Sequence, residues 1–214
     1  MLIRPAIPED IPALKVLCYD TITTICARDY NVAQIMAWAS AVENGDSIAR
    51  RFALQYFYIA EAEAAVAPTA APAPAAAAAA EEEEEAFSDA AGAGTSAMQS
   101  FVIGFASLEG VEGKRNPENG RSAEKRNVSV SDLHTGHLDL LYVHKDCQRR
   151  GVAGRLLFRI LETARELGLT GIDVEASITA RPFFEKHNFR MSGEQTVYVK
   201  GIALLNYKMH LELI

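Results

Sequence analysis

Residues 152–167 carry the clearest hydrophobic period in the chain. Apolar residues recur on one face of a helix drawn through them, and charged residues occupy the other face. Gly168 follows directly, and glycine is the residue that most often ends a helix. The pattern predicts an amphipathic helix that packs on a core through Val152, Ala153, Leu156, Leu157, Ile160, Leu161, Ala164 and Leu167.

Short apolar runs predict the strands. Residues 137–143 and 172–175 flank the amphipathic helix, and a strand–helix–strand unit of this kind implies a parallel pair. Residues 56–60 and 101–106 are typical of an antiparallel meander. The fold class is therefore α/β (α+β), with a mixed, mostly antiparallel central sheet and one parallel βαβ unit. Further strands are predicted at residues 2–4, about 196–200 and 204–211.

Helix starts are marked at three other places. Pro8 and the two acids after it predict a first helix. Asn31, with Gln34 three residues later, is a capping box that predicts a second helix, which carries Trp38. A third, short helix is predicted over residues 181–187.

Two segments differ from the rest in composition. Residues about 62–98 consist mostly of Ala, Pro, Glu and small residues. Such a segment has too little apolar surface to offset the entropy of ordering. Residues about 110–136 are rich in Gly, Asn, Ser, Lys and Arg, which predicts a long loop. We expect a single domain over residues 1–214, with a low-complexity insertion at the first segment and a polar loop at the second.

The charge balance excludes one class of partner. The chain has 214 residues, of which 21 are Lys or Arg and 28 are Asp or Glu, and its net charge is −7. Five of the negative charges belong to residues 81–85, and the rest of the chain carries −2. A nucleic-acid-binding protein generally presents a basic surface, so no nucleic acid is expected as a partner.

Membrane association and metal binding are not expected either. No apolar run approaches the ~20 residues that cross a bilayer. Residues 1–10 contain two prolines and two acids where a secretory signal requires an unbroken apolar stretch. Cys18, Cys26 and Cys147 are odd in number and widely spaced, so neither a disulfide framework nor a metal site is predicted. We expect three reduced cysteines and a cytoplasmic protein.

Candidate chemistry lies in the segment between the strand at 137–143 and the amphipathic helix. A helix start presents unpaired backbone N–H groups, and these bind phosphate well. Glycines there allow a ligand to approach the backbone, and arginines add cationic donors. The segment matches neither a P-loop nor a dinucleotide fingerprint. It predicts an anion site formed by Gln148, Arg149, Arg150, Gly151, Val152, Ala153, Gly154 and Arg155.

The same residues resemble motif A of the GNAT superfamily, the acyl-CoA-dependent N-acetyltransferases. Gln148–Ala153 satisfies the pattern [QR]-x-x-G-x-[GA], and residues 180–189 are similar to the family segment A-x-x-F-Y-E-K-x-G-F. Together with residues 35–39 and 206–209, the chain looks most like the YafP-like branch. The resemblance implies a GNAT-type fold across the chain outside the two unusual segments.

The resemblance also implies acetyl-CoA as a co-substrate. Its pyrophosphate would lie on the backbone amides of Arg149–Gly154, and its pantetheine arm would pair with residues 141–143, where that strand separates from residues 172–174. An amide N–H near Val143 would polarise the thioester carbonyl. An amine would attack directly, so Cys147 has no nucleophilic role. The implied cofactor-binding residues are Leu141, Tyr142, Val143, Gln148–Arg155, Ser177 and Phe184.

Direct attack needs a proton acceptor for the amine. Asp139 is the first candidate and His137 the second, because strand alternation places both on one face. Asp139 has an alternative role as a structural acid that bonds the region of the first two helices. Phe184 replaces a tyrosine that often protonates the leaving thiolate in the family, so the acid is Tyr207 or Tyr198, or none is needed.

Two functions follow from the resemblance. The first is an N-acetyltransferase that transfers an acetyl group from acetyl-CoA to a primary amine in a ternary complex. The alternative is a catalytically weak acyl-CoA-binding module, a sensor or scaffold. The partners would be acetyl-CoA and an amine acceptor, and a homodimer is left open. The insertion leaves a third alternative, an interaction protein. The acceptor carries no motif of its own in the sequence.

Overall fold

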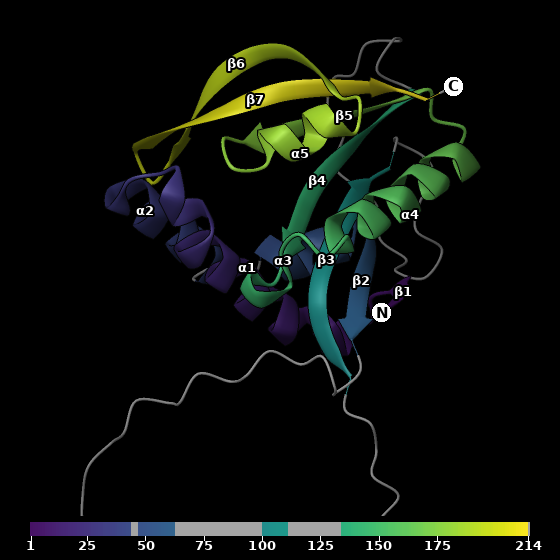
Figure 1. The fold of residues 1–214 in the computed structure, drawn as a ribbon, viewed down its shortest axis with the longest axis horizontal. Helices are drawn as coiled ribbons and strands as arrows, with labels where there is room; N and C mark the ends of the chain where they lie inside the picture. Colours follow the sequence, from purple (N-terminus) through teal and green to yellow (C-terminus); the bar gives the residue numbers. More distant parts are fainter. Residues whose placement is uncertain (44–46, 63–99, 111–133, 214) are drawn as a thin grey trace, which may run out of the picture.

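The computed structural model of the chain describes residues 1–43, 47–62, 100–110 and 134–213. Within these residues, seven strands form one sheet in the order β1-β2-β3-β4-β5-β7-β6 (Figure 1). Neighbouring strands are antiparallel except for β4 and β5, which are parallel. The predicted mixed, mostly antiparallel sheet is confirmed. The strands are β1 (Leu2–Pro5), β2 (Tyr56–Ala62), β3 (Phe101–Glu109), β4 (Thr135–Val143), β5 (Gly171–Ser177), β6 (Arg190–Val199) and β7 (Ile202–Glu212).

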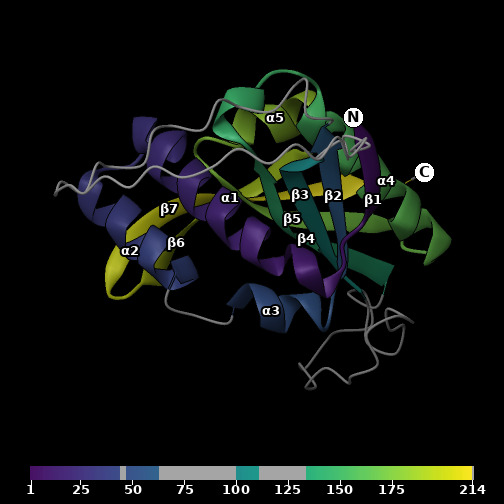
Figure 2. The same ribbon diagram turned by 90° about the horizontal axis from the view of Figure 1, so that it is seen from below.

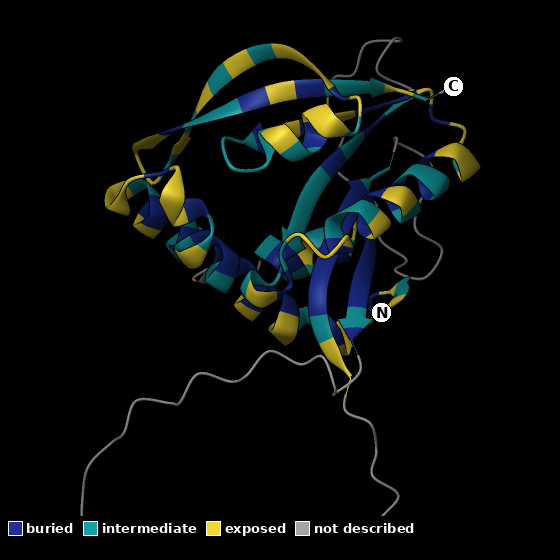
Figure 3. Ribbon diagram, in the orientation of Figure 1, coloured by how far each residue is buried: buried dark blue, intermediate teal, exposed yellow. Residues whose placement is uncertain are grey.

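Helices cover both faces of the sheet (Figures 1 and 2). Successive residues of β2 point to opposite faces, so Phe57 and Ile59 join the core under one group of helices, and Tyr58 and Ala60 join the core under the other. The first group is α1 (Ile11–Thr24), α2 (Val32–Glu43) and α3 (Ser47–Phe52); the second is α4 (Val152–Glu166) and α5 (Arg181–Lys186). Figure 3 shows that buried residues concentrate in the strands and on the inner sides of these helices.

The amphipathic helix forms as predicted. The apolar stripe of α4 is buried at Leu156, Leu157, Ile160 and Ala164, and its charged face is outside. Gly168 takes φ 71°, the left-handed conformation that ends a helix without a steric cost.

The other helix starts are largely confirmed. The capping box at α2 is formed in both directions: Asn31 N donates to Gln34 Oε1 at 3.0 Å, and Gln34 N donates to Asn31 Oδ1 at 3.0 Å. Residues after Pro8 form a short 3-10 turn, η1 (Pro8–Asp10), which leads into α1. The helix α3 was not predicted, because its six residues are too few to show a hydrophobic period.

The edges of the two unusual segments differ slightly from expectation. Ala62 is the last residue of β2 rather than the start of the insertion. Thr135 and Gly136 belong to β4, so this strand starts two residues before the predicted one. The remainder of the predicted insertion and of the predicted polar loop lies outside the described residues, apart from Gly110 and His134.

The parallel pair is short, and this creates an opening in the sheet. β4 and β5 pair only from Thr135↔Gly171 to Leu138↔Val174. Beyond that point β4 remains paired with β3, and β5 remains paired with β7 over its whole length. The two strands therefore separate after Leu138. The sequence predicted the separation beside residues 172–174, and this position is wrong. Residues 172–174 still pair with β4, and the separation begins with the next residues of β5, 175–177.

A bulge in β4 lies at the start of this opening. Ser107 pairs with Leu140 and Leu108 pairs with Leu138, so no residue of β3 stands opposite Asp139. An extra residue in one strand of an antiparallel pair bends that strand and re-aims its side chains. Consistent with this, Leu138 packs in the α4 core and Leu140 packs against the α1–α3 core.

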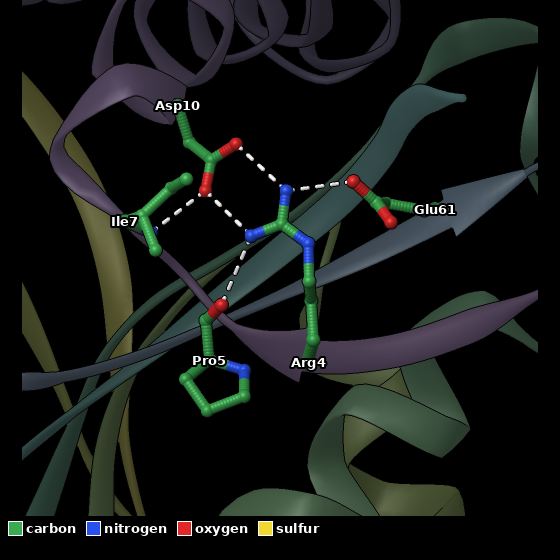
Figure 4. Close-up of polar contacts among 5 residues, drawn as sticks. All are labelled: Arg4, Pro5, Ile7, Asp10 and Glu61. Carbon is green, nitrogen blue, oxygen red and sulfur yellow. Dashed lines mark hydrogen bonds and ion pairs between the residues drawn. The ribbon is translucent and has the colours of Figure 1, made fainter. Parts of the chain in front are cut away.

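The N-terminal strand is held by an ion-pair network around Arg4 (Figure 4). Its two terminal nitrogens contact the two Asp10 carboxylate oxygens at 2.9 and 3.0 Å, and one of them also contacts Glu61 Oε1 at 2.7 Å. Asp10 Oδ2 accepts a further hydrogen bond from Ile7 N at 2.7 Å. The Asp10 and Glu61 side chains are only 10% and 14% exposed, so both carboxylates depend on Arg4 for their counter-charge.

We expect Arg4→Ala to lower the free energy of unfolding by about 2 kcal/mol, because hydrogen bonds to charged groups are lost and two largely buried carboxylates are left unpaired. Urea unfolding followed by circular dichroism measures this change. Arg165→Met, which alters an exposed position on α4, is the matched control and should change stability little. Equal stabilities for the two variants would contradict this role for Arg4.

Candidate functional site

A cavity of about 950 Å³ occupies the opening between β4 and β5. The turn before α4 and the first turn of that helix form one part of its wall. The free half of β4, the end of β5 and helix α5 form the middle. The end of α1 and the turn η2 (Cys26–Arg28) form the far wall, together with Trp38 of α2. Most residues predicted to bind a cofactor lie here: Leu141, Tyr142, Val143, Gln148, Arg149, Gly151, Val152, Ala153, Gly154, Ser177 and Phe184.

The turn before α4 has the backbone shape of an anion site. Arg149 has φ 62° and Gly151 has φ 80°, so left-handed residues alternate with others and successive N–H groups face one concave side. A Cβ atom on Gly151 would meet no protein atom within 4 Å. A Cβ atom on Gly154 would meet only His187 Nε2, at 3.7 Å. Both glycines thus leave the helix N-terminus accessible from the cavity.

Gln148 ties this turn to β4. Its side-chain Nε2 donates to Val143 O at 2.7 Å, and Thr21 Oγ1 of α1 donates to the same oxygen at 3.1 Å. Gln148 therefore has a structural partner within the protein as well as a place in the cavity wall. Thr21 was not predicted from the sequence, since a threonine inside a helix carries no signal of such a contact.

The free half of β4 presents backbone groups to the cavity. His144 N donates to Ile103 O at 2.9 Å, towards β3. Amides along a strand alternate in direction, so the N–H groups of Leu141 and Val143 point the other way, towards the opening. Among the residues that the structure describes, no strand pairs with β4 on that side beyond Leu138. The arrangement offers hydrogen bonds to an extended ligand chain lying beside β4.

Asp139 lies in the cavity wall and is held from one side. Its Oδ2 accepts from Arg51 Nε at 2.6 Å and from Gln55 Nε2 at 2.8 Å. The side chain is 18% exposed. Arg51 belongs to α3 and Gln55 follows it, so the partners do not come from the first two helices, where they were expected. The sequence did not predict them, because each lies 84 or more positions from Asp139. His137 does not line the cavity.

Phe184 forms an apolar wall of the cavity. Its ring is 2% exposed and makes edge contacts with Phe183 and Phe189 at centroid distances of 5.2 and 5.1 Å. Asn188, which replaces a family glycine, has φ 65°, as its ability to adopt the left-handed conformation allows. Ser177 Oγ accepts from Ala180 N at 3.1 Å, and this bond fixes the turn that begins α5.

Besides His137, four predicted residues lie outside the cavity wall, namely Tyr207, Tyr198, Arg150 and Arg155. Tyr207 is buried within the core, and the Arg181 guanidinium stands 4.5 Å above its ring. Arg150 and Arg155 are exposed, and Arg155 Nη1 donates to Met1 O at 3.3 Å. The structure therefore brings Asp139 and Phe184 to the cavity and leaves Tyr207 apart from them.

The far end of the cavity combines apolar and charged side chains. Ile25, Cys26 and Trp38 supply apolar surface, and Asp29 accepts a hydrogen bond from Thr179 Oγ1 at 2.6 Å. Tyr30 braces this end, since its hydroxyl donates to Leu205 O at 2.7 Å and accepts from Ile178 N at 2.9 Å. Of this group, only Cys26 and Trp38 were named from the sequence, neither as a catalytic or cofactor-binding residue.

A sequence model of the acetyltransferase (GNAT) domain matches residues 123–211. An uncharacterised N-acetyltransferase of Escherichia coli K12, YafP, is 38% identical over 73 residues, which span 34% of this chain and 45% of that protein. A GCN5-related N-acetyltransferase from Rhodopseudomonas palustris superposes with a TM-score of 0.67 at 25% identity and covers 99% of this chain and 95% of its own. Residues 123–211 thus match the GNAT domain model, and the chain shares its fold with a GNAT acetyltransferase.

The shared fold extends to more distant members of the family. The PaiA N-acetyltransferase from Thermoplasma acidophilum, solved in complex with coenzyme A, has a TM-score of 0.58 at 13% identity, covering 99% of this chain and 98% of its own. The predicted GNAT-type fold is thus confirmed. Among the described residues, no helix is long and apolar enough to cross a membrane. The same residues contain no cluster of three or more side chains suited to a metal ion.

The cysteines and Tyr142 are kept protonated by burial. Burial raises the pKa of the Cys18 thiol to about 12 and that of Cys26 to about 11, and it raises the pKa of Cys147 as well. The Tyr142 hydroxyl is likewise buried, and its pKa lies well above its ordinary value. A thiol must ionise to act as a nucleophile, so the environment of Cys147 gives no support to a covalent mechanism.

We expect all three cysteines to react far more slowly with a disulfide reagent in the folded protein than in the same protein unfolded in urea, at about pH 8. Unfolding restores the ordinary thiol pKa of ~8.5, so the unfolded chain holds more thiolate. Because the thiols ionise more readily in the unfolded chain, the free energy of unfolding should fall as the pH rises above the thiol pKa of the unfolded chain. A folded-state thiol that reacts at the unfolded rate would contradict this.

Proposed function

We propose that the protein is an N-acetyltransferase that transfers an acetyl group from acetyl-CoA to a primary amine by direct attack in a ternary complex. The observation that carries the proposal is the placement of an anion-binding turn and the free half of β4 in one cavity. The YafP and R. palustris relatives are both described as N-acetyltransferases, which supports the same reaction class.

The binding of CoA divides between two regions of the cavity. The pyrophosphate is assigned to the concave turn at Arg149–Gly154, where backbone N–H groups and the positive end of the α4 dipole favour an anion. The pantetheine arm is assigned to the amides of Leu141 and Val143, as an added strand in the opening. Phe184 supplies an apolar wall to the reactive end. The concave turn has room for a diphosphate, because the Cβ positions of Gly151 and Gly154 remain open.

The chemistry requires stabilisation of negative charge and removal of a proton. The Val143 N–H points into the opening and is suited to the thioester oxygen, where charge develops. The amine nitrogen forms its bond to the acyl carbon as the carbon–sulfur bond breaks and the CoA thiolate leaves. Asp139 is the acceptor of the amine proton, directly or through water. Its Oδ2 is engaged by Arg51 and Gln55, which leaves Oδ1 for this task.

One observation favours the alternative of a CoA-binding module without rapid turnover. Phe184 has no hydroxyl to protonate the thiolate, and Tyr207 lies outside the cavity wall. A CoA thiol of ordinary pKa, ~8.5, leaves tolerably as a thiolate near neutral pH, so the missing acid need not stop the reaction.

We expect Gly154→Val to weaken acetyl-CoA binding at least about tenfold, because the added methyl groups fill the approach to the α4 amides. Gly154 has ordinary helical φ, so the change introduces no backbone strain of the kind expected at Gly151. Isothermal titration calorimetry measures the affinity. Gly193→Val on β6, where a Cβ also meets nothing within 4 Å, is the matched control and should bind as the wild type does.

The wild-type protein is then used in a turnover screen. Release of free thiol from acetyl-CoA is followed with amino acids, polyamines, aromatic amines and N-terminal peptides. Unchanged affinity in Gly154→Val would reject the assigned cradle, and binding without turnover across all acceptor classes would favour the module.

We expect Phe184→Tyr to change kcat by less than about tenfold with the best acceptor from this screen. General acid catalysis is typically worth 10²–10⁴-fold, so a reaction whose rate was limited by the missing acid would respond far more strongly to a new hydroxyl. Phe184→Ala should instead weaken acetyl-CoA binding through lost apolar contact, by about 1.5–3 kcal/mol. A hundredfold gain in Phe184→Tyr would show that the natural protein is catalytically impaired.

A further inference from the structure

His187, at the end of α5, faces the first turn of α4 across the cavity. Its Nε2 lies 3.7 Å from the position that a Cβ on Gly154 would take. His187 lines the cavity, as do Arg149 of the turn and the neighbouring Lys186. The family resemblance did not single this residue out, because the corresponding motif position accepts any residue.

The tautomer of His187 is fixed by its hydrogen bond. Nδ1 lies 2.8 Å from Phe183 O, and a carbonyl oxygen only accepts, so Nδ1 carries the hydrogen. The ring is also held against the Phe183 ring, with centroids 4.3 Å apart. Nε2 therefore presents a lone pair to the α4 N-terminus when the ring is neutral, and an N–H when the ring is protonated.

We infer that His187 is a phosphate-binding residue that takes up a proton when the CoA pyrophosphate occupies the α4 N-terminus. A neutral Nε2 would oppose a phosphate oxygen with a lone pair. A protonated ring donates a charge-assisted hydrogen bond to that oxygen and keeps its bond to Phe183 O. The inference rests on the proposed binding of acyl-CoA and makes that binding pH-dependent.

His187 shares the cavity wall with the cationic side chains of Arg149 and Lys186, which also favour an anion there. Glu185, two residues before His187, is engaged by Arg181, whose Nε lies 2.7 Å from Glu185 Oε1. Glu175, the acid of β5 in the cavity wall, stands opposite Lys208 in the β5–β7 register. The charged residues that line the cavity together with His187 are Arg28, Asp29, Asp139, Arg149, Glu175 and Lys186.

The test uses dephospho-CoA, because the 3′-phosphate of CoA itself titrates near pH ~6 and would add its own proton linkage. Calorimetry at about pH 7 in two buffers of different ionisation enthalpy counts the protons taken up. For the wild type we expect uptake of a large fraction of one proton and affinity about tenfold weaker at about pH 8 than at about pH 6. Phosphate buffer is avoided, because inorganic phosphate would compete with the ligand for the proposed site.

Two variants separate the contribution of His187 Nε2 from the rest of the site. His187→Asn keeps an amide N–H near the Nδ1 position for Phe183 O and removes the group that faces the phosphate. It should bind about tenfold more weakly at about pH 6, take up no proton and lose the pH dependence. His187→Gln places a neutral donor near Nε2 and should bind without proton uptake. His134→Asn, an exposed histidine outside the cavity wall, is the matched control and should behave as the wild type.

The outcomes separate this inference from the proposed function. Wild-type binding without proton uptake, or equal uptake in wild type and His187→Asn, would overturn the role of His187 and leave the acyl-CoA assignment standing. A wild type that binds neither CoA nor dephospho-CoA would overturn both. Thermal melts that match the wild type show that each variant is folded.

Discussion

The separation of β4 from β5 is the constraint on which the rest of the site depends. Strand β5 is paired with β7 over all seven of its residues, and the outer half of β4 stays paired with β3. Each strand is therefore held by its other neighbour, and the two diverge after Leu138 and Val174. Backbone groups in a protein interior require partners. The divergence leaves amides of β4 that are available to an extended ligand.

The same divergence determines which turns border the cavity. The turn at residues 148–151 follows β4 and the short 3-10 helix η5 (Lys145–Cys147), and the turn into α5 follows β5 directly, so both lie at the open end of the sheet. The bond from Gln148 to Val143 O and the bond from Ser177 Oγ to Ala180 N hold these two turns in shape. His187 and Gly154 meet across the cavity because their helices begin from the two separated strands.

The acid in the cavity wall shows how a bulge and distant residues cooperate. The irregular register at Asp139 leaves this residue without a partner in β3, and α3 supplies Arg51 to one carboxylate oxygen. The hydrogen bonds from Arg51 and Gln55 fix the orientation of the Asp139 carboxylate. Its role as the proton acceptor is part of the proposed function.

The sequence by itself determined the elements and the local chemistry. Short-range signals sufficed for the stripe of α4, the stop at Gly168, the capping box of Asn31 and Gln34, and the phosphate-binding pattern at Gln148–Ala153, because each depends on residues a few positions apart. The tertiary structure decided the partners of Asp139, the position of Tyr207 outside the cavity wall and the orientation of His187 towards Gly154. These depend on strand register and helix packing, which bring together residues far apart in the chain. No local pattern records them.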